Sequence, residues 1–217
     1  MIKKIALFVF VLISFLDIIG IIFKIESLLF LFKPFILLSL LFLYSKSVLE
    51  INKWYATALI FSFFGDVFLI YSGQFPFKIG LVSFLIAHIL FIKIVMLRIK
   101  KVSFLRVLTV ILPFGIFLFL LIFLLKNSLG ELLVPVIIYG FTIATFGVVS
   151  LINYLETKSN KSLWMLIGAL VFMVSDSLLA INKFYNPAHI LEVFVMITYV
   201  LAQYFIYRSM VQKNALQ

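Results

Sequence analysis

Cysteine is absent from this 217-residue chain, and charged residues make up only 12% of it. Without cysteine the chain has no disulfide, no thiolate metal site and no cysteine nucleophile. Hydrophobic residues instead account for 65% of the sequence, including 27 Phe, whereas soluble domains have roughly 45–50%. A bilayer accepts apolar side chains on the outside of a protein as well as inside it. We therefore expect one polytopic membrane domain over residues 1–217, because no polar insert is long enough to form another.

The net charge of +10 does not indicate a nucleic-acid partner. The basic residues are dispersed among short polar segments, and no basic run with interleaved aromatic residues occurs. Membrane lipids with anionic headgroups are the expected counter-charge.

Apolar runs close to the ~20 residues needed to cross a bilayer recur along the whole chain. They predict an all-α bundle of eight transmembrane helices, without strand alternation. Three prolines, Pro34, Pro135 and Pro187, are expected near helix starts, and Pro113 inside a helix. The expected helices are 5–22, 28–44, 54–72, 79–97, 104–125, 132–152, 163–181 and 188–207.

The first apolar run follows Lys3-Lys4 and resembles a secretory signal. No small-x-small cleavage site follows, and the run continues through Asp17 and Gly20, so we expect a retained helix. With eight spans both termini share one side, which collects 12 of the 18 Lys and Arg residues, against five on the other side. This bias predicts cytoplasmic termini. We expect an integral protein of a bacterial inner membrane.

Two aspartates interrupt the hydrocarbon-like runs. Asp66 ends the segment 61–66, which is otherwise rich in Phe, and Asp176 ends the apolar segment 172–176. A charged side chain at membrane depth costs at least ~2.5–3.5 kcal/mol on insertion scales, so such acids often mark function. Both lie ~18–20 Å along their helices at 1.5 Å per residue, and we expect them in one layer of the bundle.

Other polar side chains are expected toward the same half of the membrane. Lys33 starts a span at the outer boundary and has a stem long enough to reach inward. His88 lies near the middle of its span, and Tyr199 and Gln203 lie deep in the last one. Three further residues near span ends are expected to be solvated: Asp17, His189 and Glu192.

Five separated motifs occur in order along the chain. They are Lys33-Pro34, Phe61-Ser62-x-x-Gly65-Asp66-x-x-Leu69, Phe77-x-x-Gly80-Leu81-x-x-Phe84-x-x-Ala87-His88, Gly168-Ala169-x-x-Phe172-x-x-Ser175-Asp176-x-x-Leu179-Ala180 and Thr198-Tyr199-x-x-Ala202-Gln203. At these residues the chain resembles the YhhN family of membrane proteins, whose characterised members are lysoplasmalogenases. The similarity runs from about residue 28 to 207, and within 104–152 it is limited to Pro135 and Tyr139.

The resemblance implies hydrolysis of the vinyl ether of a lysoplasmalogen, a lysophospholipid, to a fatty aldehyde and a glycerophospho-ethanolamine or -choline. That reaction needs a carboxylic acid to protonate carbon and an anion beside the resulting oxocarbenium ion. Two carboxyls divide such duties in glycosidases. We therefore expect Asp66 and Asp176 to be catalytic, with either one as the acid. The expected substrate-binding residues are Lys33, Ser62, His88, Ser175, Tyr199 and Gln203.

The same residues are also compatible with other functions. The same aspartates would serve a small proton- or cation-coupled transporter or a lipid-binding protein, or act only as polar links between helices. Two histidines and two aspartates could in principle bind zinc. Local His-x-x-x-His spacing is missing, however, and we expect neither a metal nor another cofactor.

Overall fold

The computed structural model describes residues 1–100 and 102–211, and these residues contain α-helices, one short 3₁₀-helix and no strand. This confirms the all-α class. The elements are α1 (Ile2–Ile22), α2 (Glu26–Ser45), α3 (Lys53–Ile70), α4 (Gln74–Met96), α5 (Phe104–Leu129), η1 (Gly130–Leu132), α6 (Leu133–Thr157), α7 (Asn160–Phe184) and α8 (His189–Val211).

Seven helical segments in the described part of the chain are long and apolar enough to cross a membrane. One of them, Phe104–Thr157, is a 54-residue stretch that includes α5, η1 and α6. Much of its apolar surface is uncovered; for example, Phe119 is 66% exposed and Leu112 63%. Such a surface suits lipid rather than water, and the chain is an integral membrane protein. The count of eight spans stays a prediction.

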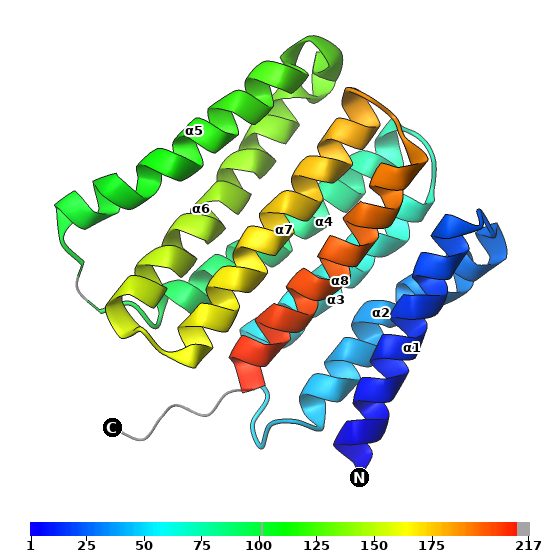
Figure 1. Cartoon of the computed structure of the whole chain (residues 1–217), viewed down its shortest axis with the longest axis horizontal. Helices are drawn as coiled ribbons and strands as arrows, with labels where there is room; N and C mark the ends of the chain where they lie inside the picture. Colours follow the sequence, from blue (N-terminus) through cyan, green and yellow to red (C-terminus); the bar gives the residue numbers. More distant parts are fainter. Residues whose placement is uncertain (101, 212–217) are drawn as a thin grey trace. The chain divides into compact units, whose positions relative to one another are not determined.

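The long stretch folds back on itself at Gly130, where φ is +49°. Glycine adopts a positive φ without the Cβ clash that other residues meet. Helices α5 and α6 then pack against each other (Figure 1). Their approach is close, because a Cβ built on Gly147 of α6 would lie 2.3 Å from the ring of Phe114 on α5. Pro113 lies inside α5, as predicted.

The described chain divides into two compact units, with the boundary inside α4, between Leu90 and Phe91. The first unit contains α1, α2, α3 and most of α4. The second contains the end of α4 and the helices α5 to α8. The prediction of a single domain over 1–217 is untested.

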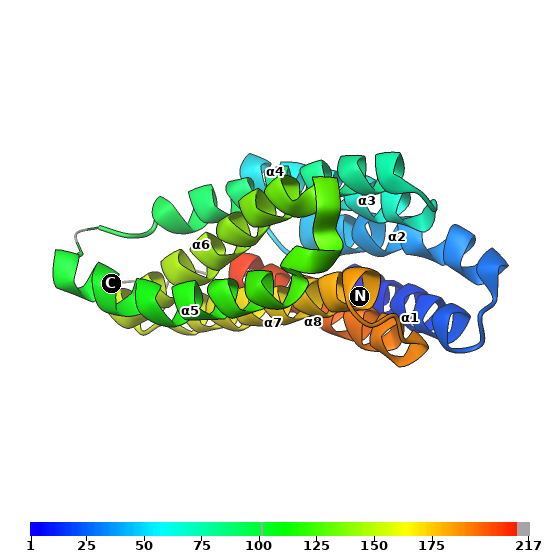
Figure 2. The ribbon, with the colours of Figure 1, turned by 90° about the horizontal axis from the view of Figure 1, so that it is seen from above.

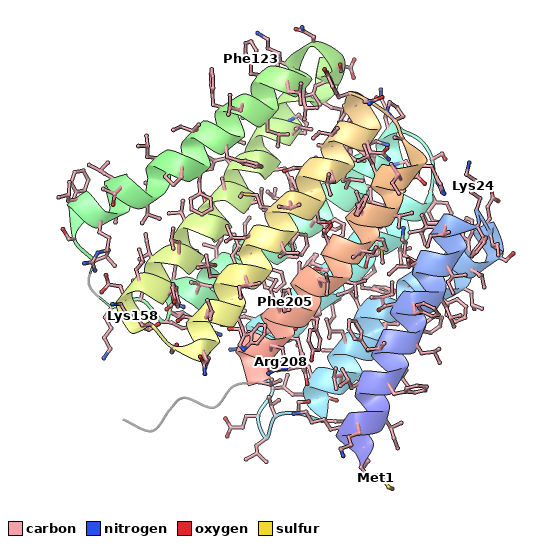
Figure 3. The ribbon with its side chains drawn as sticks, in the orientation of Figure 1. Met1, Lys24, Phe123, Lys158, Phe205 and Arg208 are labelled. Atoms are coloured by element: carbon pink, nitrogen blue, oxygen red, sulfur yellow. The ribbon has the colours of Figure 1, made fainter. Side chains whose placement is uncertain are left out.

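In the first unit, α1 and α2 form a tight helical hairpin, and both views show them side by side (Figure 2). A Cβ on Gly20 would lie 2.9 Å from the Cβ of Leu28, which shows how closely the two backbones approach. Lys24, labelled in Figure 3, occupies the connecting turn with a φ of +54°. Pro34 lies inside α2, not at its start as predicted, because α2 already begins at Glu26.

In the second unit, α7 and α8 make the closest pair (Figure 1). A Cβ on Gly168 would lie 2.7 Å from Cγ1 of Ile206 and 3.0 Å from its backbone nitrogen. At one end of the pair, the Trp164 ring stacks on Phe205, and the Arg208 guanidinium lies 5.0 Å from the centre of the Trp164 ring. Figure 3 shows Phe205 and Arg208 at the last turns of α8.

Candidate functional site

Asp66 belongs to the buried face of α3. The buried residues of this helix follow the period of an α-helix and are Tyr55, Ala58, Leu59, Ser62, Gly65 and Asp66. The exposed fraction of Asp66 is 5%. Beside it, a Cβ on Gly65 would lie 2.5 Å from the Phe84 ring of α4, and one on Gly80 would lie 3.3 Å from the Gly65 carbonyl oxygen. Two glycines therefore let α4 approach α3 closely next to Asp66.

Ser62 lies one turn before Asp66 on the same face and is fully buried. Its hydroxyl has no hydrogen-bond partner among the described residues. An unsatisfied buried hydroxyl costs free energy. Ser62 therefore has a donor and an acceptor to offer to a bound molecule, which suits its predicted role in substrate binding.

His88 lies on α4, one turn after Phe84, and its side chain is fully buried. Its Nδ1 is 2.9 Å from the carbonyl oxygen of Phe84. Because a carbonyl oxygen only accepts hydrogen bonds, Nδ1 carries the hydrogen of this bond. The ring orientation is thereby fixed, and in the neutral ring Nε2 is the acceptor.

Lys33, on α2, is half-buried and attracted electrostatically by Asp17 of α1. The exposed fraction of Asp17 is 0%, and neither carboxylate oxygen has a hydrogen-bond partner among the described residues. The prediction that Asp17 is solvated is therefore wrong. It failed because the tight α1–α2 packing at Gly20 covers the last turns of α1.

Asp176 is half-buried on α7, and the hydroxyl of Tyr139 on α6 donates a hydrogen bond to its Oδ2 atom. The predicted site residues did not include Tyr139. The one signal in the sequence was that Tyr139 matched the family pattern in a region where little else did. A separation of 37 positions in the sequence hides the contact of the two residues, which arises only when α6 packs on α7.

Three other predicted residues lie on α7 and α8. The Ser175 hydroxyl donates to the carbonyl oxygen of Val195 at 2.9 Å, which ties α7 to α8. Tyr199 packs edge-on against Phe172, with ring centres 5.5 Å apart. Nε2 of Gln203 lies 3.5 Å from the Tyr199 hydroxyl, and Oε1 of Gln203 has no hydrogen-bond partner among the described residues.

Near the start of α8, His189 and Glu192 form an i, i+3 contact at 3.4 Å. Their side chains are 36% and 55% exposed, which agrees with the expected solvation. Among residues 1–100 and 102–211, no three His, Asp or Glu side chains are grouped closely enough to hold a metal ion.

The structure groups the predicted residues by unit. The first unit holds Lys33, Ser62, Asp66 and His88, and the second holds Ser175, Asp176, Tyr199 and Gln203. The pairing of Asp66 with Asp176 involves both units and stays a prediction.

The model of the YhhN family matches residues 28–210, which include most of α2, all of α3 to α7 and nearly all of α8. The chain belongs to the YhhN family. It is also 28% identical over 168 residues to "Lysoplasmalogenase TMEM86A" of Bos taurus. That match covers 72% of this chain and 64% of the bovine protein, so the chain spans a little under two thirds of its relative's length. No solved structure matches the chain.

Proposed function

We propose that this YhhN protein hydrolyses the vinyl ether bond of lysoplasmalogens inside the membrane. The observation that carries the proposal is the presence of two aspartates, one 5% exposed and one half-buried, on helices long and apolar enough to span. Intramembrane acids are costly and are usually functional. The similarity to a protein named lysoplasmalogenase supports the choice of reaction.

The proposed topology has eight spans, with α5 and α6 as separate spans and both termini in the cytoplasm. A single helix of 54 residues would be about 80 Å long at ~1.5 Å per residue, far more than the ~30 Å of a hydrocarbon core. The turn at Gly130 divides that stretch into two helices of spanning length. The lysine and arginine bias supports the cytoplasmic termini, and we propose a bacterial inner membrane as the location.

The reaction begins with transfer of a proton to the β carbon of the vinyl ether, which produces an oxocarbenium ion. Water adds to the cationic carbon and loses a proton. The resulting hemiacetal then breaks its bond to the glycerol oxygen. The products are the free glycerophospho-ethanolamine or -choline and an aldehyde with one new C–H bond. The overall change is addition of one water molecule, so no oxidant, reductant or cofactor is needed.

We assign the proton donor and the anionic partner of this reaction to Asp66 and Asp176. An acid and an anion placed on one substrate provide general acid catalysis, typically worth about 10²–10⁴-fold, and stabilise the developing cation. The same division between two carboxyls operates in glycosidases, whose transition state is also an oxocarbenium ion.

We assign binding of the polar part of the substrate to the other predicted residues. Lys33 is a positive charge suited to the phosphate. The Ser62 hydroxyl and the amide oxygen of Gln203 are free to bind the glycerol hydroxyl or the attacking water. We also assign His88, Ser175 and Tyr199 to substrate binding. The single alkenyl chain needs only apolar contacts, and it enters sideways from the surrounding lipid.

The direct test is aldehyde release from an alkenyl lysophosphatidylcholine by the purified protein in detergent. The alkyl and acyl analogues of the same lipid serve as controls, because neither becomes an oxocarbenium ion by carbon protonation. In D₂O, the aldehyde should carry one deuterium on the carbon next to the carbonyl. Cleavage without that deuterium would contradict the proposed chemistry.

The first variants to test are Asp66→Asn and Asp176→Asn. Each should lower kcat by about 10²–10⁴-fold, the usual contribution of acid–base groups, while the protein remains folded. Asp17→Asn is a matched control, because Asp17 is also buried on a spanning helix but lies outside the region that the family model matches. It should retain kcat within a few-fold, although KM is expected to change because Asp17 interacts electrostatically with Lys33. If either Asp66→Asn or Asp176→Asn turns over substrate as fast as Asp17→Asn, the assignment is wrong.

A second test uses the absence of cysteine from the chain. Single cysteines can replace Asp66 and Asp176 and carry spin labels without interference from other thiols. The doubly labelled protein should show dipolar broadening that the singly labelled proteins lack, since both carboxyls must reach one small substrate. No broadening, or proton-coupled uptake into proteoliposomes without aldehyde release, would favour a transporter instead.

A further inference from the structure

Tyr139 and Asp176 form a hydrogen bond between α6 and α7 that the assigned chemistry does not yet use. The phenolic hydroxyl is the donor, and Oδ2 of the carboxyl group is the acceptor. Both side chains are half-buried within one compact unit, so neither is fully solvated by its surroundings. A hydrogen bond in such a setting is stronger than one in water.

The strength of this bond differs between the two forms of the carboxyl group. An ionised carboxylate only accepts hydrogen bonds, and a phenol hydroxyl can donate to it. Hydrogen bonds with one charged partner are shorter and about twice as strong as those between neutral groups. The tyrosine hydroxyl therefore stabilises Asp176 as an anion more than as an acid.

Asp66 has a different environment. It is 5% exposed, and it lies where α4 packs directly onto α3 through Gly65 and Gly80. Burying a charge costs much more than burying a neutral polar group. A proton donor must keep its proton until the substrate arrives, and deep burial favours that form.

We propose that Tyr139 is a positioning residue that holds Asp176 as the anionic partner of the oxocarbenium ion, which makes Asp66 the proton donor. This inference rests on the proposed function and decides between the two roles that the sequence left open. Tyr139 does not touch the reacting carbon in this assignment. It acts through Asp176, by fixing both the charge and the orientation of that carboxyl group.

The charge of Asp176 can be measured without any turnover. The chain contains three aspartates, Asp17, Asp66 and Asp176. In a protein labelled with ¹³C at the aspartate carboxyl, the variant D17N/D66N leaves Asp176 as the single labelled group. Its infrared band at neutral pH should be that of a carboxylate. Adding Tyr139→Phe should convert part of this band to that of a protonated carboxylic acid.

Tyr154→Phe is the matched control for Tyr139→Phe, since Tyr154 is a half-buried tyrosine on the same helix. It should leave the Asp176 band unchanged. An Asp176 band that is protonated while Tyr139 is intact, or that ignores Tyr139→Phe, would overturn the inference. If the double variant does not fold, the same comparison is made in D66N alone, with the wild-type spectrum used to identify the bands.

Kinetics and ligand binding provide a second readout. Tyr139→Phe should lower kcat about 10- to 100-fold, the scale of one hydrogen bond to a charged group, and change KM little. A lysolipid analogue with a secondary ammonium in place of the ether oxygen imitates the cation. It should bind at least 10-fold more weakly to Asp176→Asn than to the wild type, but nearly normally to Asp66→Asn. The reverse pattern would exchange the two roles and overturn the inference.

These measurements separate the two proposals. If the wild-type protein releases no aldehyde, the proposed function fails, whatever the infrared band shows. If aldehyde is released but Tyr139→Phe changes neither the Asp176 band nor kcat, the function stands and the role of Tyr139 is rejected.

Discussion

Helices α3 and α7 each carry an aspartate directly after a small residue, and yet they hold it in different ways. On α3, Gly65 precedes Asp66 and lets the Phe84 ring of α4 pack against the backbone. On α7, Ser175 precedes Asp176 and uses its hydroxyl to bind the backbone of α8. Asp66 is nearly fully buried, whereas Asp176 is half-buried and bound by Tyr139.

The comparison shows that similar short patterns can place carboxyl groups in dissimilar chemical environments. The small residue before each aspartate determines how closely the neighbouring helix approaches. The neighbouring helix then determines which groups lie nearby: the Phe84 ring packs against Gly65 on α3, and the Tyr139 hydroxyl donates to Asp176 on α7. A difference in chemical role between two similar aspartates therefore arises from the helices packed around them.

Among substitutions next to the two aspartates, Gly65→Ala is expected to have the largest effect on stability. The new methyl group would lie 2.5 Å from the buried ring of Phe84, so α3 and α4 would have to separate. We expect a loss of ~1–3 kcal/mol of stability, as for other overpacked cores, together with reduced turnover because Asp66 shifts. Thermal unfolding in detergent measures the first and aldehyde release the second.

Gly115→Ala on α5 is the matched control, because a Cβ there meets no atom within 4 Å. It should leave stability equal or slightly raised, since alanine favours helix more than glycine does. Equal melting temperatures for the two variants would mean that the contact behind Asp66 is not tight.

A smaller effect is expected from Ser175→Ala. The substitution removes the hydrogen bond to Val195 and leaves a carbonyl oxygen with one donor fewer. The expected loss is about 0.5–1.5 kcal/mol of stability, the net contribution of a typical hydrogen bond. Thermal unfolding should detect it. A rise in KM would support the proposed role of Ser175 in substrate binding, and an unchanged KM would contradict that role.

The smallest effect on stability is expected from Ser62→Ala. The buried Ser62 hydroxyl has no partner among the described residues, so its removal breaks no hydrogen bond that the structure shows. Stability should stay within about 0.5 kcal/mol or rise, because an unsatisfied polar group is lost. If Ser62 binds substrate, KM should rise. A loss of stability larger than that of Ser175→Ala would contradict the expectation that the Ser62 hydroxyl adds no stability.

The sequence was sufficient to locate the eight α-helices of residues 1–100 and 102–211, because each apolar run has nearly the length of a span. The ends were less accurate. Helix α4 begins at Gln74 and not at 79, and α6 continues to Thr157 and not only to 152. Helices continue beyond the apolar run because their first and last turns can be polar at the membrane surface, and hydropathy does not record that extension.

The site was predictable only in part, for a related reason. Asp66 and Asp176 stand out because a carboxyl group in an apolar run is rare, and that signal is local. The donation from Tyr139 to Asp176 and the closeness of Asp17 to Lys33 depend on which helix faces meet. A single sequence contains the periodicity of each face but not the partner against which it packs.

The buried carboxylate of Asp17 gives α1 an electrostatic importance that its place outside the family match would not suggest. Lys33 on α2 is a positive charge within apolar surroundings, and Asp17 is a negative charge that offsets it. A shortened protein that starts at α2 would lose this compensation and expose the closely packed face around Leu28 to lipid. Any minimal version made for biophysical work should therefore retain the first helix.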